Sequence, residues 1–264
     1  MKGNAQRWVA VLLVGLWHCS CLAKQGASNT APDIQVIEQL AASLNESHVT
    51  ARCRRKLTFG GDCECNFRDA PDLKPKDIVF DMHMYSRRRV CIGDDYLRPG
   101  ACRVLSLQTD PDNDQPETFQ KALVNFGCSS DDVTEMDAEA TFAKWKNFSL
   151  RMQMKKMRVK SLDLLDVSAP GLEGKILADL LKQKPRISAK QLTLTVVLDA
   201  DERMGEPESS FTMKVARENL LLLQRIEAAG YNMLSIRPNP KCVASVQEEY
   251  GLCLPVTADV TWVK

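Results

Sequence analysis

An acidic turn at residues 108–114 is the first place in this chain where side chains of a reactive type recur at a regular spacing. Carboxylates occupy alternate positions of the turn, at Asp110, Asp112 and Asp114. A calcium-binding loop begins in this way, but it requires glycine at its sixth position and glutamate at its twelfth. Those positions hold Gln115 and Lys121. We therefore expect a solvated turn and no metal site.

The elements on either side of this turn predict a nucleotide-type α/β unit. An apolar strand at 103–107 precedes the turn, and a helix at 117–126 follows it and ends at Gly127. In such a unit the turn carries glycine, so that the backbone can approach a cofactor closely. Gln108 stands at that position, and its Cβ would obstruct the approach. The pattern supports the fold and weakens the case for cofactor chemistry.

The cysteine content predicts disulfide bonds. Two of the ten cysteines belong to the N-terminal segment, which leaves eight. The eight are Cys53, Cys63, Cys65, Cys91, Cys102, Cys128, Cys242 and Cys253. An even number behind a signal peptide favours disulfides, but eight cysteines allow 105 pairings and the sequence does not choose among them. Cys63 and Cys65 could instead bind zinc, but the partners for such a site are missing, since the only nearby histidine is His83.

The first 23 residues are typical of a secretory signal peptide. Lys2 and Arg7 precede an apolar run at 8–17, and small residues near position 23 suit cleavage. The run is shorter than the roughly 20 apolar residues of a membrane-spanning helix. We expect a secreted or lumenal protein, with a single-pass signal anchor as the alternative. Glycosylation sequons at Asn45 and Asn147 agree with this compartment.

The charge balance argues against nucleic acid as a partner. The chain has 35 basic and 34 acidic residues, a formal net charge of +1. No strong electrostatic field follows from this balance. The expected partner is an acceptor substrate or a protein of unknown identity, with no membrane contact beyond the signal anchor.

The apolar periodicity predicts an α/β fold with a mostly parallel sheet. The expected strands are 78–80, 89–92, 103–107, 162–167, 191–198, 233–236 and 256–263. The expected helices are 32–44, 117–126, 172–181 and 213–229. Strands that alternate with helices of this length place helices on both faces of the sheet. The last two strands have no expected helix between them, so they can pair antiparallel at one edge.

Two segments are expected to lack regular structure. Residues 53–76 are rich in Cys, Gly, Pro and charge, which predicts a loop pinned by disulfides. Residues 129–139 form an acidic patch where a second strand would be expected. We divide the chain into a signal peptide at 1–23, a polar leader with the first helix at 24–52, and one disulfide-stapled domain at 53–264.

Several phrases occur together in an order that resembles a known family. They are RVCIGD at 89–94, PGACRVLS at 99–106, Gly-Cys at 127–128, Gly-Leu-Glu-Gly at 171–174, and a tail with Gly-Tyr at 230–231, Arg-Pro-Asn-Pro at 237–240 and Cys242. This looks like the methyltransferase-like proteins of animal secretory pathways, the group around methyltransferase-like protein 24, related to the FkbM-type methyltransferases. The resemblance covers roughly residues 53–262. It implies a class I, Rossmann-like methyltransferase fold with seven strands, the last antiparallel, and S-adenosylmethionine at the carboxyl ends of the first strands.

The resemblance also implies site residues. The cofactor cleft would be lined by Gln108, Asp110, Asp131 and Asp166. Glu173 would be the nearest acid, although it could equally cap the helix that starts there. Where the family pattern has a lysine, an aspartate and a tryptophan, this chain has Asp166, Ser168 and Gly174. Two hypotheses follow: a lumenal methyltransferase that binds S-adenosylmethionine, or an inactive extracellular binding or structural protein on the same fold.

Overall fold

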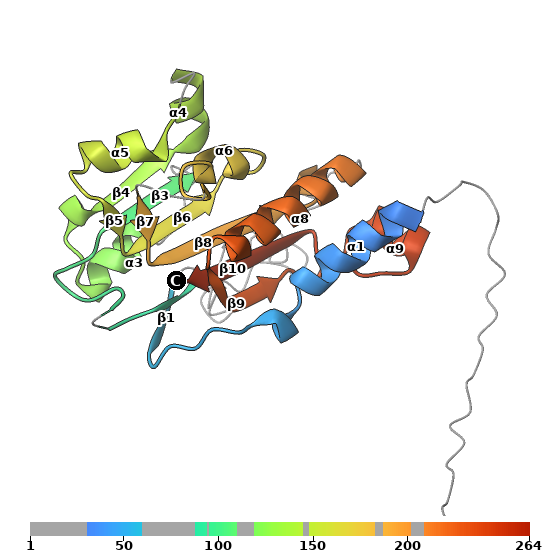
Figure 1. Cartoon of the computed structure of the whole chain (residues 1–264), viewed down its shortest axis with the longest axis horizontal. Coiled ribbons are helices and arrows are strands. Elements are labelled where there is room, and N and C mark those ends of the chain that lie inside the picture. The colour runs from blue at the N-terminus through green and yellow to red at the C-terminus, as the bar shows by residue number, and fades with distance from the viewer. Residues whose placement is uncertain are drawn as a thin grey trace, which may run out of the picture.

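The computed structural model describes residues 31–59, 88–93, 95–109, 119–144, 148–182, 187–201 and 209–264. Several predictions fall outside these residues: the signal peptide, the strand at 78–80, and the site residues Cys63, Cys65, Asp110 and Asn147. Within the described residues the fold is α/β, built on a six-stranded sheet that helices flank (Figure 1).

The six-stranded sheet is mostly parallel, as the sequence predicts. Its strands are β3 (Val104–Gln108), β4 (Val133–Asp137), β6 (Leu164–Ser168), β8 (Gln191–Val197), β9 (Asn232–Pro238) and β10 (Thr257–Val263). They are ordered β4-β3-β6-β8-β10-β9. The first four run parallel to one another, and β10 runs antiparallel to both of its neighbours.

The expectation that the last two strands pair antiparallel at one edge of the sheet is confirmed. In this pair β9 forms the edge and β10 lies inside the sheet, next to β8. A short helix, α9 (Ala244–Tyr250), also connects them where no helix was expected. The burial of the two strands explains this order. The last four residues of β10 are all buried, whereas β9 has exposed residues at both of its ends, which suits an edge strand.

Two segments expected to be irregular contain strands. The acidic patch at 129–139 holds a short 3-10 helix, η2 (Ser130–Asp132), and then β4. β4 is an edge strand that pairs only with β3 among the described strands, so its polar side chains keep partial contact with solvent. In the 53–76 segment, β1 (Lys56–Phe59) pairs antiparallel with β2 (Arg88–Cys91). Tertiary pairing thus outweighs weak strand propensity in both places.

The helices agree with the sequence where the apolar periodicity is long. α1 (Ala31–Ser43), α3 (Phe119–Phe126) and α8 (Met213–Ala228) match expected helices. α6 (Glu173–Leu177) is shorter than the expected 172–181, because the chain continues from Ala178 as hydrogen-bonded turns. α4 (Ala138–Lys144) and α5 (Leu150–Lys156) were not expected. The remaining elements are η1 (Glu46–His48) and a small parallel pair, β5 (Ser161–Leu162) with β7 (Ser188–Ala189).

One face of the large sheet forms the main hydrophobic core. Alternate residues of its strands, such as Leu105, Leu107 and Leu165, are fully buried in a cluster with side chains of α1, α5, α6 and α8. α1 packs along α8, as Figure 1 shows. α8 begins where the Thr212 side chain accepts a hydrogen bond from the backbone N–H of Val215, a regular N-cap. This face positions the strands, whose other side chains point to the opposite face.

The opposite face is covered differently, by α3 and the β1–β2 pair. A smaller apolar cluster there joins Val104, Val133 and Leu164, near the amino ends of three parallel strands, to Leu123 of α3 and Val90 of β2. Towards the carboxyl ends of the strands the same face is polar. Helices therefore lie on both faces of the sheet, as predicted, but the second face includes a buried polar region.

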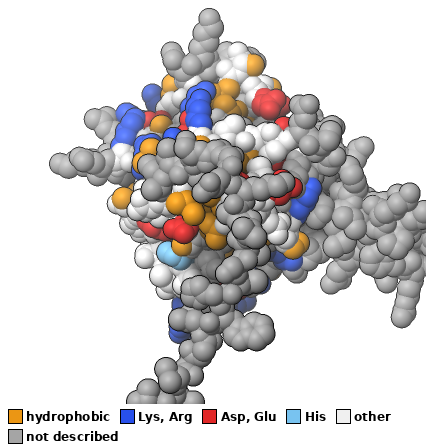
Figure 2. Space-filling view, turned by 90° about the vertical axis from the view of Figure 1, so that its right-hand side faces the viewer, with side chains coloured by type: hydrophobic (Ala, Val, Ile, Leu, Met, Phe, Trp, Pro, Cys, Tyr) orange, Lys and Arg blue, Asp and Glu red, His pale blue; other side chains and the backbone are white. Residues whose placement is uncertain are grey.

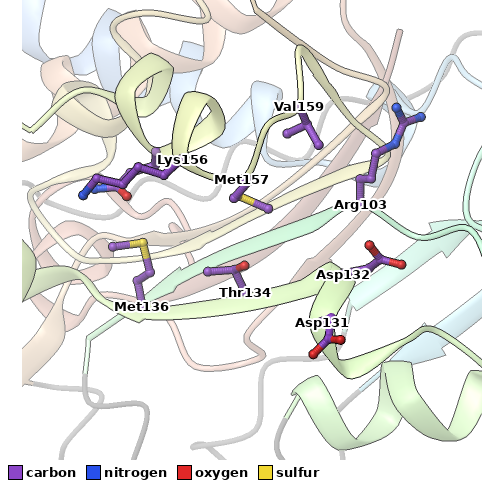
Figure 3. Close-up of a pocket in the computed structure, with 9 residues that line it drawn as sticks. Arg103, Asp131, Asp132, Thr134, Met136, Lys156, Met157 and Val159 are labelled. Atoms are coloured by element: carbon purple, nitrogen blue, oxygen red, sulfur yellow. The ribbon is translucent and has the colours of Figure 1, made fainter.

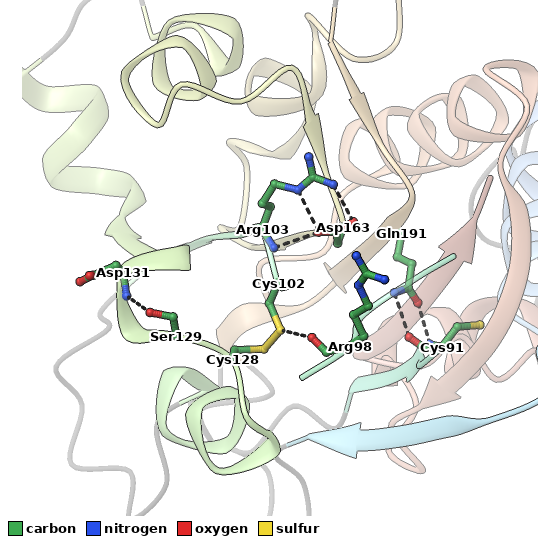
Figure 4. The surroundings of a disulfide bond; sticks show 9 residues. All are labelled: Cys91, Arg98, Cys102, Arg103, Cys128, Ser129, Asp131, Asp163 and Gln191. Atoms are coloured by element: carbon green, nitrogen blue, oxygen red, sulfur yellow. Dashed lines mark hydrogen bonds and ion pairs between the residues drawn. A yellow bond between two sulfur atoms is a disulfide. The ribbon is translucent and has the colours of Figure 1, made fainter. Parts of the chain in front are cut away.

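Three disulfides staple the described part of the chain. Cys53 pairs with Cys91, Cys102 with Cys128, and Cys242 with Cys253, with Cα atoms 5.9, 5.4 and 5.1 Å apart. The first ties the N-terminal segment to β2. The second joins a residue two positions before β3 to a residue two positions after α3 (Figure 4). The third closes the turn that contains α9. These pairings resolve six of the eight cysteines that the sequence left open.

Candidate functional site

A row of polar side chains crosses the sheet at the middle of β3 and β6. Ser106, Asp166 and Thr193 are in register on β3, β6 and β8, so their side chains share one face. The Ser106 hydroxyl donates to Asp166 Oδ2 at 2.7 Å, and the Thr193 hydroxyl donates to Asp166 Oδ1 at 2.6 Å. Asp166 is 0% exposed. The resemblance implies that Asp166 lines a cofactor cleft, and the structure places its buried carboxylate in a network of hydrogen bonds.

Arg88 of β2 completes this network from the opposite side. Its guanidinium donates to Asp166 and forms a buried ion pair with it. Burial disfavours the charged guanidinium, but the carboxylates of Asp166, Asp259 and Glu135 outweigh this effect and raise the pKa of Arg88 above its ordinary value. Sequence reasoning missed Arg88, because no local pattern links it to a residue 78 positions away.

Gln108 lies at the carboxyl end of β3, where the resemblance places the cofactor. Its amide nitrogen donates to the Ser106 hydroxyl at 2.8 Å and to Asp166 Oδ2 at 3.4 Å. The Gln108 side chain therefore folds back onto its own sheet. A glycine at this position would let the backbone approach a cofactor closely. Gln108 instead adds a Cβ, and its side chain hydrogen-bonds to Ser106 and Asp166. The described residues at this point do not fit S-adenosylmethionine.

The structure separates Asp131 from the other predicted cleft residues. Asp131 lies in η2, before the amino end of β4, while Gln108 pairs with Asp137 at the carboxyl end of that strand. Asp137 was missed because the strand that ends with it was not expected. Its side chain accepts a hydrogen bond from the backbone N–H of Ala140 at 3.0 Å and so caps α4. Among the predicted cleft residues that the structure describes, only Gln108 and Asp166 are brought together.

Glu173 lies in a pocket of about 480 Å³ beyond the carboxyl ends of β6 and β8. The pocket walls come from the chain after β6, the chain after β8, and α8. They comprise Pro170, Gly171, Glu173, Gly174, Lys175, Val197, Leu198, Ala200, Ser210, Val215, Glu218, Asn219, Leu221, Leu222 and Arg225. Ligands of open parallel sheets bind at this edge, so the pocket is a candidate binding site.

The carboxyl group of Glu173 is the most perturbed acid of the site. Burial raises its pKa to about 7, although the backbone N–H groups of Glu173 and Gly171 donate to it and oppose this shift. The side chain is 7% exposed. A carboxyl group that exchanges a proton near neutral pH can accept or donate a hydrogen bond and can act in acid–base chemistry.

Two described segments that follow β8 in the chain are hydrogen-bonded to each other beside this pocket. The backbone N–H of Ser210 donates to Asp199 Oδ1 at 3.0 Å, and the Ser210 hydroxyl accepts from the backbone N–H of Ala200 at 2.9 Å. The pocket floor is apolar, with Val197 and Leu222. A small ligand with an apolar body and one polar group directed at Glu173 would suit these walls.

The amino edge of the sheet holds a second group of charges (Figure 4). Asp163, just before β6, accepts hydrogen bonds from the backbone N–H and the guanidinium of Arg103 at 3.0–3.3 Å, and it pairs with Lys190 at 2.9 Å. Burial disfavours the Asp163 carboxylate, but Arg103 and Lys190 outweigh it and lower its pKa. The cluster joins the starts of β3, β6 and β8, so its role is structural.

The remaining sequence predictions receive partial support. Asn45 is exposed and N-caps η1, accepting from the Ser47 backbone N–H at 2.9 Å, so its glycosylation stays a prediction. The three disulfides fit a protein of the secretory lumen or the extracellular space. Among the described helices, none is long and apolar enough to cross a membrane. In that same part of the chain, no three His, Cys, Asp or Glu side chains gather as a metal site would.

The described surface at one end of the molecule carries side chains of mixed type. Figure 2 shows the end that carries α1 and α9, and the described apolar, acidic and basic side chains visible there are interspersed. No family model matches the sequence, and no curated protein resembles it significantly. The function is therefore inferred from the geometry of the site.

Proposed function

We propose that this chain is a class I methyltransferase-like protein of the secretory pathway that acts as a binding protein and has lost its site for S-adenosylmethionine. The pocket beside Glu173 is its ligand-binding site. This proposal joins the fold that the sequence resemblance implies to the closed network around Asp166.

The order of the strands is the observation that carries the fold part of the proposal. A class I methyltransferase sheet is expected to be parallel except for its last strand. Here four parallel strands precede an antiparallel β10, which is the last strand of the chain. An antiparallel last strand next to parallel β8 is hard to obtain from simple repetition of strand–helix units, so this order supports the class I assignment.

The network at the end of β3 supports the loss of cofactor binding. Methyl transfer requires that donor and acceptor be held in line, so the groups that hold the donor supply much of the rate. In this chain the candidates for that task, Gln108, Ser106 and Asp166, hydrogen-bond to one another and to Arg88 and Thr193. A cofactor would have to break these bonds, and a buried Arg88 would then lose its carboxylate partner.

An active methyltransferase is the second candidate, and Asp137 favours it. An acid at the carboxyl end of the second strand of such a sheet accepts hydrogen bonds from ribose hydroxyls. Asp137 ends β4 and lies next to Gln108 in register. The carboxylate has one oxygen hydrogen-bonded to the Ala140 backbone, which leaves acceptor capacity on the group.

Calorimetry with S-adenosylmethionine and S-adenosylhomocysteine separates the two candidates. The probe protein is the full chain, secreted from cells with its disulfides formed. We expect no binding heat up to millimolar cofactor. Micromolar binding that Asp137→Asn weakens would overturn the proposal, because asparagine still caps α4 but lacks the charge. Asp131→Asn, in η2 before the amino end of β4, is the matched control and should change nothing.

A further inference from the structure

Four exposed basic residues stand at the entry to β1, in the sequence Arg-Cys-Arg-Arg-Lys at 52–56. The backbone of residues 51–55 belongs to no helix or strand, and β1 begins at Lys56. None of the four side chains forms an ion pair within the described part of the chain. Exposed segments without regular structure are the preferred sites of proteolysis. The run therefore combines uncompensated positive charge with a position that a protease can reach.

Two other runs of adjacent basic residues occur in the chain, and the fold protects both from a protease. The run at 87–89 continues into β2, where Arg88 is 6% exposed and forms the buried ion pair with Asp166. The third run, Lys155 and Lys156, belongs to the helix α5, on which Figure 3 shows Lys156. A protease binds several residues of its substrate as an extended chain, so a helix or a buried strand must first unfold locally. Of the three runs, the one at 52–56 is the most accessible.

The spacing of the arginines suits the subsites of a protease that selects basic sequences. Relative to the bond between Arg55 and Lys56, guanidinium groups stand one, two and four residues before the cut. A subsite with a carboxylate holds a guanidinium through charge-assisted hydrogen bonds, as the specificity pocket of trypsin does. Successive side chains of an extended chain point to opposite sides, so Arg52 and Arg54 enter subsites on one side and Arg55 on the other. Three such contacts distinguish this run from a single exposed arginine.

The bond between Arg55 and Lys56 lies at the end of a small sheet, where local opening costs little. The Arg55 carbonyl accepts a hydrogen bond from the backbone N–H of Ile92 at 3.0 Å, and Lys56 pairs with Cys91 at the start of β1. Terminal pairs of this kind open at a small fraction of the global unfolding free energy, and cleavage follows the population of the opened form. The Cys53–Cys91 disulfide does not engage the arginines, because Cys53 is the one residue of the four before the bond that is not an arginine.

We propose that an endoprotease of the secretory pathway with carboxylate-lined subsites cleaves this chain between Arg55 and Lys56. The step is a hydrolysis: one water is consumed, the amide C–N bond breaks, the hydroxyl goes to the Arg55 carbonyl carbon and the proton to the Lys56 nitrogen. A new carboxylate and a new amino group result. The cleavage rests on the proposed secretory location, and it goes beyond the ligand pocket at Glu173, on which it does not depend.

The cleaved protein stays in one piece, because a disulfide spans the cut. Cys53 lies before the cut and Cys91 after it, so the two chains remain covalently linked. The N-terminal chain carries α1, whose Ile37 and Leu40 are 0% exposed in the main core. The fold therefore keeps its core, while the connection between α1 and β1 is opened.

The test follows the chain secreted from cells with a C-terminal affinity tag. We expect one species on electrophoresis without reductant and two with it, and amino-terminal sequencing of the tagged fragment should begin at Lys56. Arg52→Ala and Arg55→Ala should abolish the cut, because each removes a guanidinium contact. Arg89→Ala, which changes the run in β2 at an exposed position, is the matched control and should be cleaved like the parent chain.

A purified endoprotease that requires arginine one and four residues before the bond makes the result independent of the cell. It is added to the full, disulfide-bonded chain from cells that lack this enzyme. A chain that stays intact, or is cut at 87–89 instead, would overturn the proposal. An intact chain that heparin retains, and that Arg52→Ala releases at lower salt, would also overturn it and assign the four cations to a sulfated polysaccharide. Cleavage of a chain that cells do not secrete would support the site and contradict only the proposed location.

Discussion

Two buried acids, Asp163 and Glu173, flank strand β6, and their surroundings shift their pKa values in opposite directions. Asp163, at the amino end, has Arg103 and Lys190 as ion-pair partners, and these cations lower its pKa despite burial. Glu173, beyond the carboxyl end, has only backbone N–H donors, and burial raises its pKa to about 7. The first acid is held charged and joins three strands. The second can change its protonation state in a pocket, which is why we propose the ligand site at the carboxyl end.

Asp166 extends the comparison to the middle of the same strand, and its removal should have the largest effect. Asp166→Ala leaves Arg88 buried without the carboxylate it pairs with. We expect a loss of roughly 3–5 kcal/mol in the free energy of unfolding, measured by urea denaturation. The exposed Asp131→Ala should stay within about 0.5 kcal/mol of the parent chain. A loss below about 1 kcal/mol for Asp166→Ala would mean that the network is not tightly coupled.

Glu173 should make stability fall as pH rises, because its raised pKa means that the folded state binds its proton more tightly than the unfolded state. The contribution is fully present below the ordinary pKa of 4.5 and is lost as pH rises through about 7. The loss amounts to roughly 3 kcal/mol. Glu173→Gln should remove this slope, so that the variant is the more stable protein at pH 8. Parallel pH profiles of the two proteins would contradict the assignment.

Asp163 should give the opposite pH dependence and a smaller effect. Its lowered pKa stabilises the fold above the ordinary value of 3.8, and this contribution is lost as pH falls through the folded-state pKa. Because Arg103 and Lys190 are partly exposed, we expect Asp163→Asn to cost only about 1–2 kcal/mol at pH 7. The cost should shrink in acid, as measured by urea unfolding at several pH values. If the destabilisation by Asp163→Asn grew as pH falls, Asp163 and Glu173 would not respond to pH in opposite ways.

Trp262 carries a buried polar group that is uncharged, and Trp262→Phe should change the stability of the fold least. The indole of Trp262 is fully buried, and its Nε1 has no hydrogen-bond partner among the described residues. Trp262→Phe removes some packing and also removes an unsatisfied donor, so the two effects should nearly cancel, with a change under about 1 kcal/mol. Trp262→Ala should cost about 3–5 kcal/mol. Equal losses of stability for Trp262→Phe and Trp262→Ala, measured by thermal unfolding, would indicate that Nε1 has a hydrogen-bond partner after all.

The long periodic elements could be predicted because their signal is local. α8 and β8 appear almost within their expected bounds, since a 16-residue amphipathic helix and a strand rich in apolar and β-branched residues each require burial wherever they lie. β4 could not be predicted in the same way. Its sequence is acidic, and it becomes a strand only because β3 offers a free edge in register.

Some features of the candidate site could likewise be predicted from the sequence, and others could not. The sequence alone determined that Gln108 replaces a glycine, that Glu173 follows a buried strand, and that the cysteines form disulfides, because each depends on residue type and neighbouring positions. Tertiary structure alone decided that Arg88 and Asp166 form one buried pair, that the basic run at 52–56 is exposed, and which cysteines join. Those outcomes depend on contacts between residues far apart in the chain, and local sequence carries no signal for such contacts.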